Sequence, residues 1–390
     1  MRAVVAITAA ATVVVILLLQ IRIMFPAVDL QGVSTYLDLE KESILQKLDY
    51  KIDEINEKVN QLVELANDEI EAGQTKPYLR QQRKQPEEID QKGSDSSESL
   101  RCRIGTAPWS HLTQAEWNDY LKEFNNIYVR RLDERNDGGG GFFHYFGLFV
   151  VIRTIQPTAI VESGAWNGMG TWFLRQIAGP TVKIVVISPQ TPTKYKDPQA
   201  LYLTGSKFID FSKTTVEQWK NWVPDIERTL LFMDDHQAAV RRLQEARALG
   251  FQHLFFDDNY PPAAGDNFSA KQICSGMNLW NFLGQEHATW KDNFSQVSRR
   301  LPPTEYKELE QRFHENTAVY AEFPPTWKGP SRFEILNEEK YEQISEPPLF
   351  TKEQLAALGV EERQTAGFDA EAAKYTFALY VQAKPLSWKL

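Results

Sequence analysis

The sequence from residue 101 onward predicts an α/β fold with a doubly wound, mostly parallel sheet. Short β-branched runs alternate there with helix-length segments, which is the pattern of strand–helix–strand units. A glycine-rich turn follows the first of these strands, and acidic residues follow two later ones directly. Ligands of such sheets bind at the carboxyl ends of the strands, so these residues also predict where a site lies.

The expected elements follow one another along the chain. A helix-length apolar segment, Phe142–Ile155, precedes a short strand that ends at Glu162, and the next helix extends to about Ala178. Further strands are expected at Val182–Ile187, Lys207–Asp210, Thr229–Met233, His253–Phe256 and Tyr375–Gln382. Further helices are expected at Thr215–Trp222, Gln237–Leu249 and Ala270–Phe282.

The net charge of −9 is distributed unevenly over the 390 residues. Residues 29–100 carry 17 acidic and 9 basic side chains, so the rest of the sequence is nearly neutral. A chain without a basic surface is not expected to bind nucleic acid. Its two cysteines are too few for a disulfide-rich scaffold or a four-cysteine zinc site.

Residues 1–26 are predicted to form a transmembrane signal anchor. Ala3–Leu19 contains no charged side chain and, as a helix, extends about 26 Å, close to the thickness of a bilayer core. A cleaved signal peptide is the alternative, although the residues after Leu19 make a poor cleavage site. We therefore expect a single-pass type II membrane protein that faces the Golgi or ER lumen, or a secreted protein if the segment is removed.

Two segments separate this anchor from the main domain. Residues 36–71 predict a coiled-coil stem and a homodimer, although one amphipathic helix lying on the main domain would show the same pattern. Its apolar positions have heptad spacing: Leu45, Leu48, Ile52, Ile55, Val59, Leu62 and Ala66. Residues 72–100 are polar and predict a flexible linker. Residues 101–390 are the predicted Rossmann-like domain, with an insertion at about 285–350 that either covers the site or is surface structure.

Two sequence features bear on a lumenal location. Cys102 and Cys274 can pair in an oxidising compartment, but two unpaired buried thiols are equally compatible with the sequence. Asn267 and Asn293 each begin an Asn-x-Ser glycosylation sequon. Both features agree with a lumen-facing glycoprotein without establishing one.

Charged and glycine residues gather at three expected strand ends. The first strand ends at Glu162, which is followed by Gly164, Gly168 and Gly170. Asp234-Asp235-His236 follows the fourth strand, and Asp257-Asp258 follows the fifth. Since the carboxyl ends of parallel strands lie along one edge of a sheet, these groups are expected to face one crevice. The spacing fits neither a dinucleotide-binding G-x-G-x-x-G motif nor a P-loop.

The segment Glu162–Thr171 resembles motif I of the class I S-adenosylmethionine-dependent methyltransferases. The pattern over Phe142–Leu283 is similar to one branch of them, the cephalosporin hydroxylase / rhamnosyl O-methyltransferase family. The resemblance rests on the glycine turn, on Phe-Met-Asp-Asp-His at the fourth strand and on Phe-Asp-Asp at the fifth. It implies a Rossmann-like methyltransferase fold and metal-assisted O-methylation of a glycan or small hydroxylated acceptor.

The resemblance also implies roles for individual residues. The S-adenosylmethionine pocket would be lined by Glu162, Gly164, Asn167, Gly168, Gly170 and Ser188. Asp234, Asp257 and Asp258 would bind Mg²⁺ or another divalent cation, which prefers oxygen ligands. His236 or Asp235 would then accept the proton of the acceptor hydroxyl.

Ser188 departs from the family pattern. An acid usually ends the second strand and binds the ribose hydroxyls, whereas this strand ends in Ser188-Pro189-Gln190. Two other functions therefore stay open: a metal-dependent glycosyltransferase-like enzyme, and a non-catalytic dimeric binding protein on a decayed methyltransferase fold. The usual Asp-x-Asp triplet of the former is absent.

Each candidate residue also has a purely structural interpretation. Glu162 could cap the turn that follows it, and Asp234 and Asp235 could cap the next helix. The Asp257-Asp258 pair could be ordinary turn chemistry, and His236 could serve only to support its neighbours. The coincidence of these groups at successive strand ends favours a site.

Overall fold

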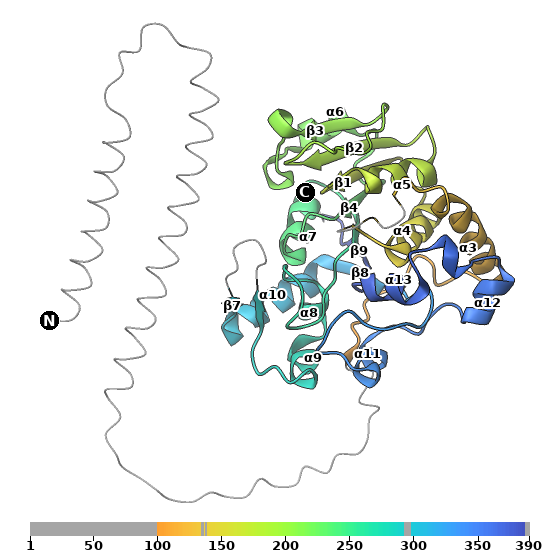
Figure 1. Cartoon of the computed structure of the whole chain (residues 1–390). Helices are drawn as coiled ribbons and strands as arrows, with labels where there is room; N and C mark the ends of the chain where they lie inside the picture. The colour runs from red at the N-terminus through yellow and green to blue at the C-terminus, as the bar shows by residue number, and fades with distance from the viewer. Residues whose placement is uncertain (1–99, 134–135, 137–138, 292–297, 387–390) are drawn as a thin grey trace, which may run out of the picture. The chain divides into compact units, whose positions relative to one another are not determined.

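The computed structural model describes residues 100–133, 136, 139–291 and 298–386. Seven of its strands form one sheet, and helices pack on both faces of that sheet (Figure 1). The predicted signal anchor, stem and linker and the sequon at Asn293 lie outside these residues. Within the described part of the chain, none of the helices combines the length and the apolar character that crossing a membrane requires.

The sheet has the strand order β3-β2-β1-β4-β5-β9-β8. Its strands are β1 (Ala159–Ser163), β2 (Lys183–Ser188), β3 (Leu201–Thr204), β4 (Thr229–Met233), β5 (His253–Phe256), β8 (Thr317–Glu322) and β9 (Leu379–Ala383). The first five are parallel to one another, and β9 pairs antiparallel with both β5 and β8. The predicted α/β fold with a mostly parallel, Rossmann-like sheet is therefore confirmed.

Two strand predictions differ from the structure. The strand expected at Lys207–Asp210 is wrong: the third strand is Leu201–Thr204, and the chain leaves the sheet at Gly205, whose φ of +58° ends the strand. The strand β8 was not expected, because it lies within the predicted insertion and follows α10 (Pro303–Asn316) directly. Residues 285–350 therefore supply part of the central sheet as well as loops.

The helix expected at Ala270–Phe282 is divided into two. It consists of α8 (Lys271–Cys274) and α9 (Gly276–Phe282), and Gly276 between them has a φ of +60°. The other predicted helices are present as α4 (Phe142–Ile155), α5 (Met169–Ala178), α6 (Val216–Trp222) and α7 (Ala239–Ala248). The remaining elements are α3 (Gln114–Tyr128), α11 (Glu338–Ile344), α12 (Lys352–Ala357), α13 (Phe368–Lys374) and the small β6–β7 hairpin (Thr289–Lys291, Ser298–Arg300).

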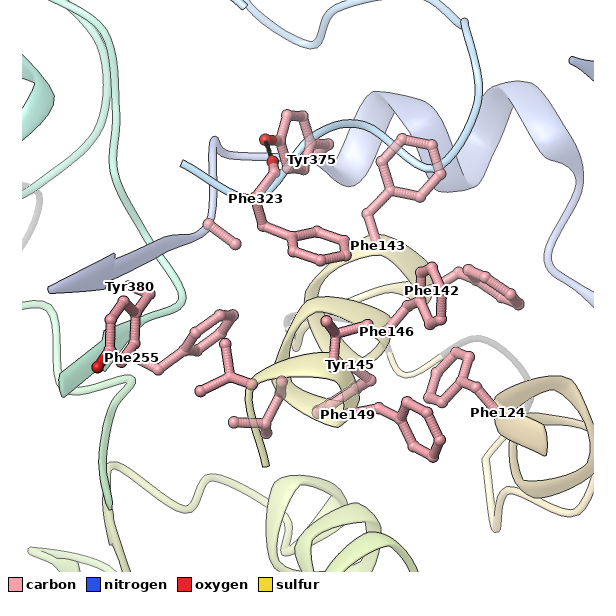
Figure 2. Close-up of a cluster of buried hydrophobic side chains, with 14 of the residues drawn as sticks. Phe124, Phe142, Phe143, Tyr145, Phe146, Phe149, Phe255, Phe323, Tyr375 and Tyr380 are labelled. Carbon is pink, nitrogen blue, oxygen red and sulfur yellow. Dashed lines mark hydrogen bonds between the residues drawn. The ribbon is translucent and has the colours of Figure 1, made fainter. Parts of the chain in front are cut away.

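One face of the sheet is covered by an aromatic layer. Helices α3, α4 and α5 pack there against alternate strand residues such as Ile160, Val186 and Phe232. Figure 2 shows the centre of this layer, where Phe142, Phe146 and Phe149 of α4 lie beside Phe124 of α3. Because α4 is apolar on all sides, it is buried along most of its length and fixes the position of the loop that precedes it.

The opposite face is covered by α6, α7, α8 and α10. The intervening strand residues, such as Val161, Val185 and Leu231, pack there against Trp219 and Trp280. Successive residues of each strand thus enter opposite cores, as expected for a central strand buried on both faces. The charged residues of the predicted site belong to neither core and lie at the strand ends.

Cys102 and Cys274 form a disulfide, with Cα atoms 5.5 Å apart. The bond joins the start of the described chain to α8 across 172 residues of sequence. Asn267, by contrast, is only 6% exposed, and Ser269 of its sequon is fully buried. Burial of this kind disfavours a glycan on Asn267 in the folded domain.

Candidate functional site

The sheet reverses its strand order between β1 and β4. Strand β1 pairs with β2 on one side and β4 on the other, so the chain turns outward in both directions from this point. In open α/β sheets the crevice outside the carboxyl ends of such strands is where ligands bind. The glycine turn after β1 and the acids after β4 and β5 all lie at these ends.

The glycine turn approaches its neighbours too closely for any larger residue. Gly164 and Gly168 have φ values of +91° and +93°, in the left-handed region. A Cβ on Gly164 would collide with the carbonyl oxygen of Asp234, and one on Gly168 with that of Tyr195. Asn167 lies one residue before Gly168, which is the N-cap of α5, and its Oδ1 accepts the Met169 N–H at 3.0 Å. These contacts give the turn a fixed shape at the start of α5.

Glu162 lies beneath this turn and is 1% exposed. Thr171 donates a hydrogen bond to Oε2, whereas Oε1 has no partner among the described residues. Burial raises the pKa of Glu162 to about 8, although the Thr171 bonds lower it. A Cβ on Gly170 would collide with Oε1, so Gly170 leaves the space that this oxygen occupies. An unpaired buried carboxyl oxygen at a ligand crevice is a candidate contact for a donor on the ligand.

A polar pocket of about 390 Å³ opens beside the turn. Its lining comes from the turn, from the loop after β2 and, through Asp133, from the loop after α3: Asp133, Trp166, Asn167, Gln190, Thr191, Thr193 and Lys194. Trp166 is 62% exposed and has a φ of +38°, which is uncommon for a large side chain. Ser188, at the end of β2, is buried. The loop after this strand supplies Gln190 and Thr191 to the pocket, and the acid of the pocket, Asp133, comes from the loop after α3 and pairs with Lys194.

A second cluster lies at the ends of β4 and β5. Asp234, His236 and Asp258 each offer a ligand atom within 4.8 Å of the others. His236 Nδ1 lies 3.2 Å from Asp258 Oδ2 and 3.1 Å from Asp266 Oδ1. The structure thus brings Asp234 and Asp258 together as the sequence predicted. It adds His236 to them and leaves Asp257 outside the group.

Burial raises the pKa values of Asp234, Asp257 and Asp258, and the charge of Asp257 adds to the effect on the other two. Burial, followed by the charges of Asp257 and Asp258, holds the pKa of Asp234 well above its usual range. The pKa of Asp258 is raised mainly by burial and then by Asp257. Burial raises the pKa of Asp257 to about 7, and its Oδ1 has no hydrogen-bond partner in the described part of the chain. Such a concentration of negative charge favours a bound cation.

His236 is the nitrogen donor in this group of three residues. Its hydrogen bond to Asp266, opposed by burial, raises its pKa to about 9. Its backbone φ of +54° is strained for a histidine and turns the ring toward Asp258 and Asp266. Without a cation the ring is therefore protonated at neutral pH.

Asp235 belongs to a different arrangement. Ser163 Oγ donates to its Oδ2 at 2.6 Å, and Arg242 Nη2 lies 2.8 Å from the same oxygen. Arg242 is 2% exposed and also contacts Asp210 and Glu245. These contacts occupy Asp235, so it is less available for proton transfer than its position in the sequence suggested.

Several residues around the acids were not identified from the sequence. His144 accepts the Gly141 N–H at 3.0 Å and contacts Thr376 Oγ1, which donates to the Asp257 carbonyl at 2.8 Å. Burial lowers the pKa of His144 to about 4. The available signal was a lone histidine in the apolar segment Phe142–Ile155. Asp266 gave no such signal, because it lies in a polar turn and reaches His236 only through the fold.

A larger cavity, of about 1010 Å³, lies elsewhere. Residues 325–353 form most of its wall, together with Arg101 and Asp369. Its lining includes none of the residues at the strand ends. The same segment reaches the acids at another point, where Phe333 contacts Tyr260 and the Arg332 guanidinium lies 6.0 Å from the Tyr260 ring.

No family model matches the chain, and the curated proteins contain no relative that matches it. Among solved structures it is similar to cofactor-bound Rv0187 from MTB, with 13% identity over 38% of this chain and 74% of that one and a TM-score of 0.24. A Klebsiella pneumoniae protein assigned as an O-methyltransferase has 14% identity, coverages of 43% and 78% and a TM-score of 0.25. A cyclopropane-fatty-acyl-phospholipid synthase-like protein from Lactobacillus casei has 12% identity, coverages of 68% and 97% and a TM-score of 0.27. With scores this low, function has to be inferred from the site.

Proposed function

We propose that this domain binds S-adenosylmethionine in the crevice between β1 and β4 and transfers its methyl group to a hydroxyl. The observation that supports this most directly is the glycine turn at the point where the strand order reverses. Gly164 and Gly168 allow close backbone approach, and the unpaired Oε1 of Glu162 lies under the same turn. The adjacent polar pocket offers Asn167, Gln190 and Thr191 to a ribose-bearing ligand.

A divalent cation fits the neighbouring acids. The charges of Asp257 and Asp258 raise the pKa of Asp234, and one ligand atom each of Asp234, His236 and Asp258 lies within 4.8 Å of the others. When bound, a cation supplies charge that lowers the pKa of an acceptor hydroxyl. Asp234 and Asp258 would hold it. For proton transfer, the contacts of Asp235 to Ser163 and Arg242 disfavour that residue, whereas His236 lies within the cluster.

We further propose that the domain faces an oxidising lumen, tethered by the apolar segment Ala3–Leu19. The Cys102–Cys274 disulfide supports this, since such bonds persist in secretory compartments. The acceptor class that suits this location is a glycan or a small hydroxylated molecule. Alkylating the unfolded full chain without a reductant should label neither cysteine. Labelling of both would contradict a lumenal location.

Ser188 favours a second candidate function. A buried serine cannot replace a carboxylate that holds two ribose hydroxyls, so the domain could instead be a non-catalytic binding protein on the same fold. The two candidates differ in the ligands that they are expected to bind, which can be measured. A methyltransferase binds both the methyl donor and its demethylated product, S-adenosylhomocysteine.

The test is calorimetric titration of the full chain in detergent. S-adenosylmethionine, S-adenosylhomocysteine and a UDP-sugar are each titrated with and without Mg²⁺ or Mn²⁺. Binding of the first two ligands supports the proposal, and a response to neither refutes it. Glu162→Gln should weaken S-adenosylmethionine binding by about tenfold or more, since it alters the unpaired carboxyl group. Glu217→Gln, on the exposed start of α6, is the matched control and should change nothing.

A further inference from the structure

The ligand group after β4 and β5 contains a nitrogen donor. Asp234, His236 and Asp258 converge from two strand ends, with one ligand atom of each within 4.8 Å of the others. The metal ligands expected from the sequence were three carboxylates. The structure replaces Asp257 with an imidazole in this group, which changes the class of cation that the site suits.

The backbone of His236 is shaped to place this imidazole. A histidine with a φ of +54° costs free energy unless other contacts compensate for the strain. Here the strained residue directs its ring to Asp258 and Asp266, at 3.2 and 3.1 Å. Strain of this kind is concentrated at functional sites, where it holds a side chain in a position that an unstrained turn would not give.

Asp266 stands where a supporting carboxylate is expected. Histidines that bind metals usually donate their other ring N–H to a carboxylate or carbonyl, which fixes the ring orientation. The side chain of Asp266 is 9% exposed and its Oδ1 contacts His236 Nδ1. In a neutral ring whose Nδ1–H donates to Asp266, Nε2 carries the lone pair that a cation requires.

Asp257 gives an independent indication of a cation. It is 6% exposed, and its Oδ1 has no hydrogen-bond partner among the described residues. That oxygen lies 3.4 Å from the position of a Cβ on Gly140. The charge of Asp257 acts on both Asp234 and Asp258. A buried carboxyl group next to two other acids adds negative potential at the site, although Asp257 does not belong to the group of three ligands.

We propose that Asp234, His236 and Asp258 form a mixed nitrogen–oxygen site that binds a first-row transition-metal ion in preference to Mg²⁺ or Ca²⁺. Imidazole suits Zn²⁺, Fe²⁺ and related ions, whereas Mg²⁺ and Ca²⁺ prefer sites made only of oxygen. This deepens the proposed function by naming the class of its cation. It also makes His236 a ligand, with Asp266 as its positioning residue, in place of a role in proton transfer.

The experiment uses metal alone, with no methyl donor. The full chain in detergent is stripped with a chelator and titrated with Zn²⁺ and Mg²⁺ by calorimetry, and with Co²⁺ by visible absorption. We expect Zn²⁺ and Co²⁺ to bind at least about 100-fold more tightly than Mg²⁺. Bound Co²⁺ should give an absorption spectrum that reports its coordination.

Two variants and a control test the individual residues. His236→Gln should weaken Co²⁺ binding by about 10- to 100-fold, change its spectrum and leave Mg²⁺ affinity within about threefold. Asp266→Asn should weaken Co²⁺ binding by about tenfold, because the ring loses its supporting acceptor. His111→Gln, at an exposed position before α3, should bind Co²⁺ like the parent chain. Circular dichroism in chelator establishes that each variant is folded.

Three results would overturn the inference. They are equal affinities for Mg²⁺ and Zn²⁺, a folded His236→Gln variant with an unchanged Co²⁺ spectrum, and no binding of any cation. The outcome is separable from that of the proposed function. A chain that binds Co²⁺ through His236 but never binds S-adenosylmethionine supports this site and refutes methyl transfer.

Discussion

The acids after β4 lie in two regions that differ in how their charge is balanced. In the first, which we call the Arg242 network, a buried guanidinium contacts Asp235, Asp210 and Glu245, so each carboxylate has a cationic partner. In the second, the crevice cluster, Asp258 contacts the ring of His236, whereas the described residues show no ion pair to Asp234. Asp234 and Asp235 are adjacent in the chain but belong to different regions.

The difference separates structural charge from functional charge. Compensated buried ions stabilise a fold only if every partner is present, and removal of one leaves the others unpaired. Uncompensated acids in a crevice cost stability and persist where a ligand can balance them. The two regions should therefore respond oppositely when charge is removed.

The largest effect is expected from Arg242→Met, which breaks the first region. Three carboxylates would lose their buried partner, and the free energy of unfolding should fall by about 3–5 kcal/mol. Guanidinium denaturation at pH 7 measures this. Arg241→Met is the matched control, since this neighbour is exposed and contacts only Glu245, so its loss should cost about 0.5 kcal/mol. Similar losses in both variants would mean that the Arg242 network is not a structural unit.

A smaller effect is expected from pH, through His144 behind the crevice cluster. Its folded pKa of about 4 lies below the ordinary value of 6.5, so between these values only the unfolded chain binds the proton. The free energy of unfolding should therefore fall as the pH is lowered. His144 should account for about 2 kcal/mol of the loss between pH 7 and pH 5.

The His144 prediction is tested by the slope of stability against pH. His144→Gln should make the slope shallower by that amount, whatever its effect at pH 7, and His111→Gln should leave the slope unchanged. An unchanged slope in the His144 variant would show that the imidazole titrates normally in the fold.

Removing charge from the crevice cluster should stabilise the fold, whereas removing Arg242 should destabilise it. The pKa of Asp234 is raised in the folded chain, so its carboxylate costs stability above pH 4. In chelator, Asp234→Asn should raise the free energy of unfolding by about 1–2 kcal/mol at pH 7 and by little near pH 3. Added Zn²⁺ should stabilise the parent chain and not the variant. If Asp234→Asn instead lowers the free energy of unfolding in chelator, Asp234 belongs with the paired acids of the Arg242 network.

The smallest effect is expected at the boundary between the regions. Ser163 donates to Asp235, so Ser163→Ala should cost about 0.5–1 kcal/mol while Arg242 keeps the carboxylate paired. Thermal unfolding detects a change of this size. The cost of Ser163→Ala should be different in a chain that already carries Arg242→Met, because Ser163 and Arg242 contact the same oxygen of Asp235. Strict additivity would indicate that the two contacts are independent.

Local patterns in the sequence were sufficient for most of the fold. The alternation of strands and helices and the glycine turn follow from side-chain periodicity and from backbone conformations open to glycine. Strand β8 was missed because its burial depends on pairing with β9, which lies 57 residues farther along the chain from Glu322 to Leu379. The third strand was misplaced because its four residues are too few to show a clear side-chain period.

The sequence by itself determined which residues reach the crevice, because parallel strands bring their carboxyl ends to one edge. Glu162, Asp234 and Asp258 lie at or beside the carboxyl ends of β1, β4 and β5. Only the tertiary structure decided how each acid is balanced. Asp235 lies seven residues before Arg242, whereas Asp266 reaches His236 from 30 residues away, and such partners follow from packing. Position along the chain can place a charge at a strand end, but its environment depends on contacts made only after folding.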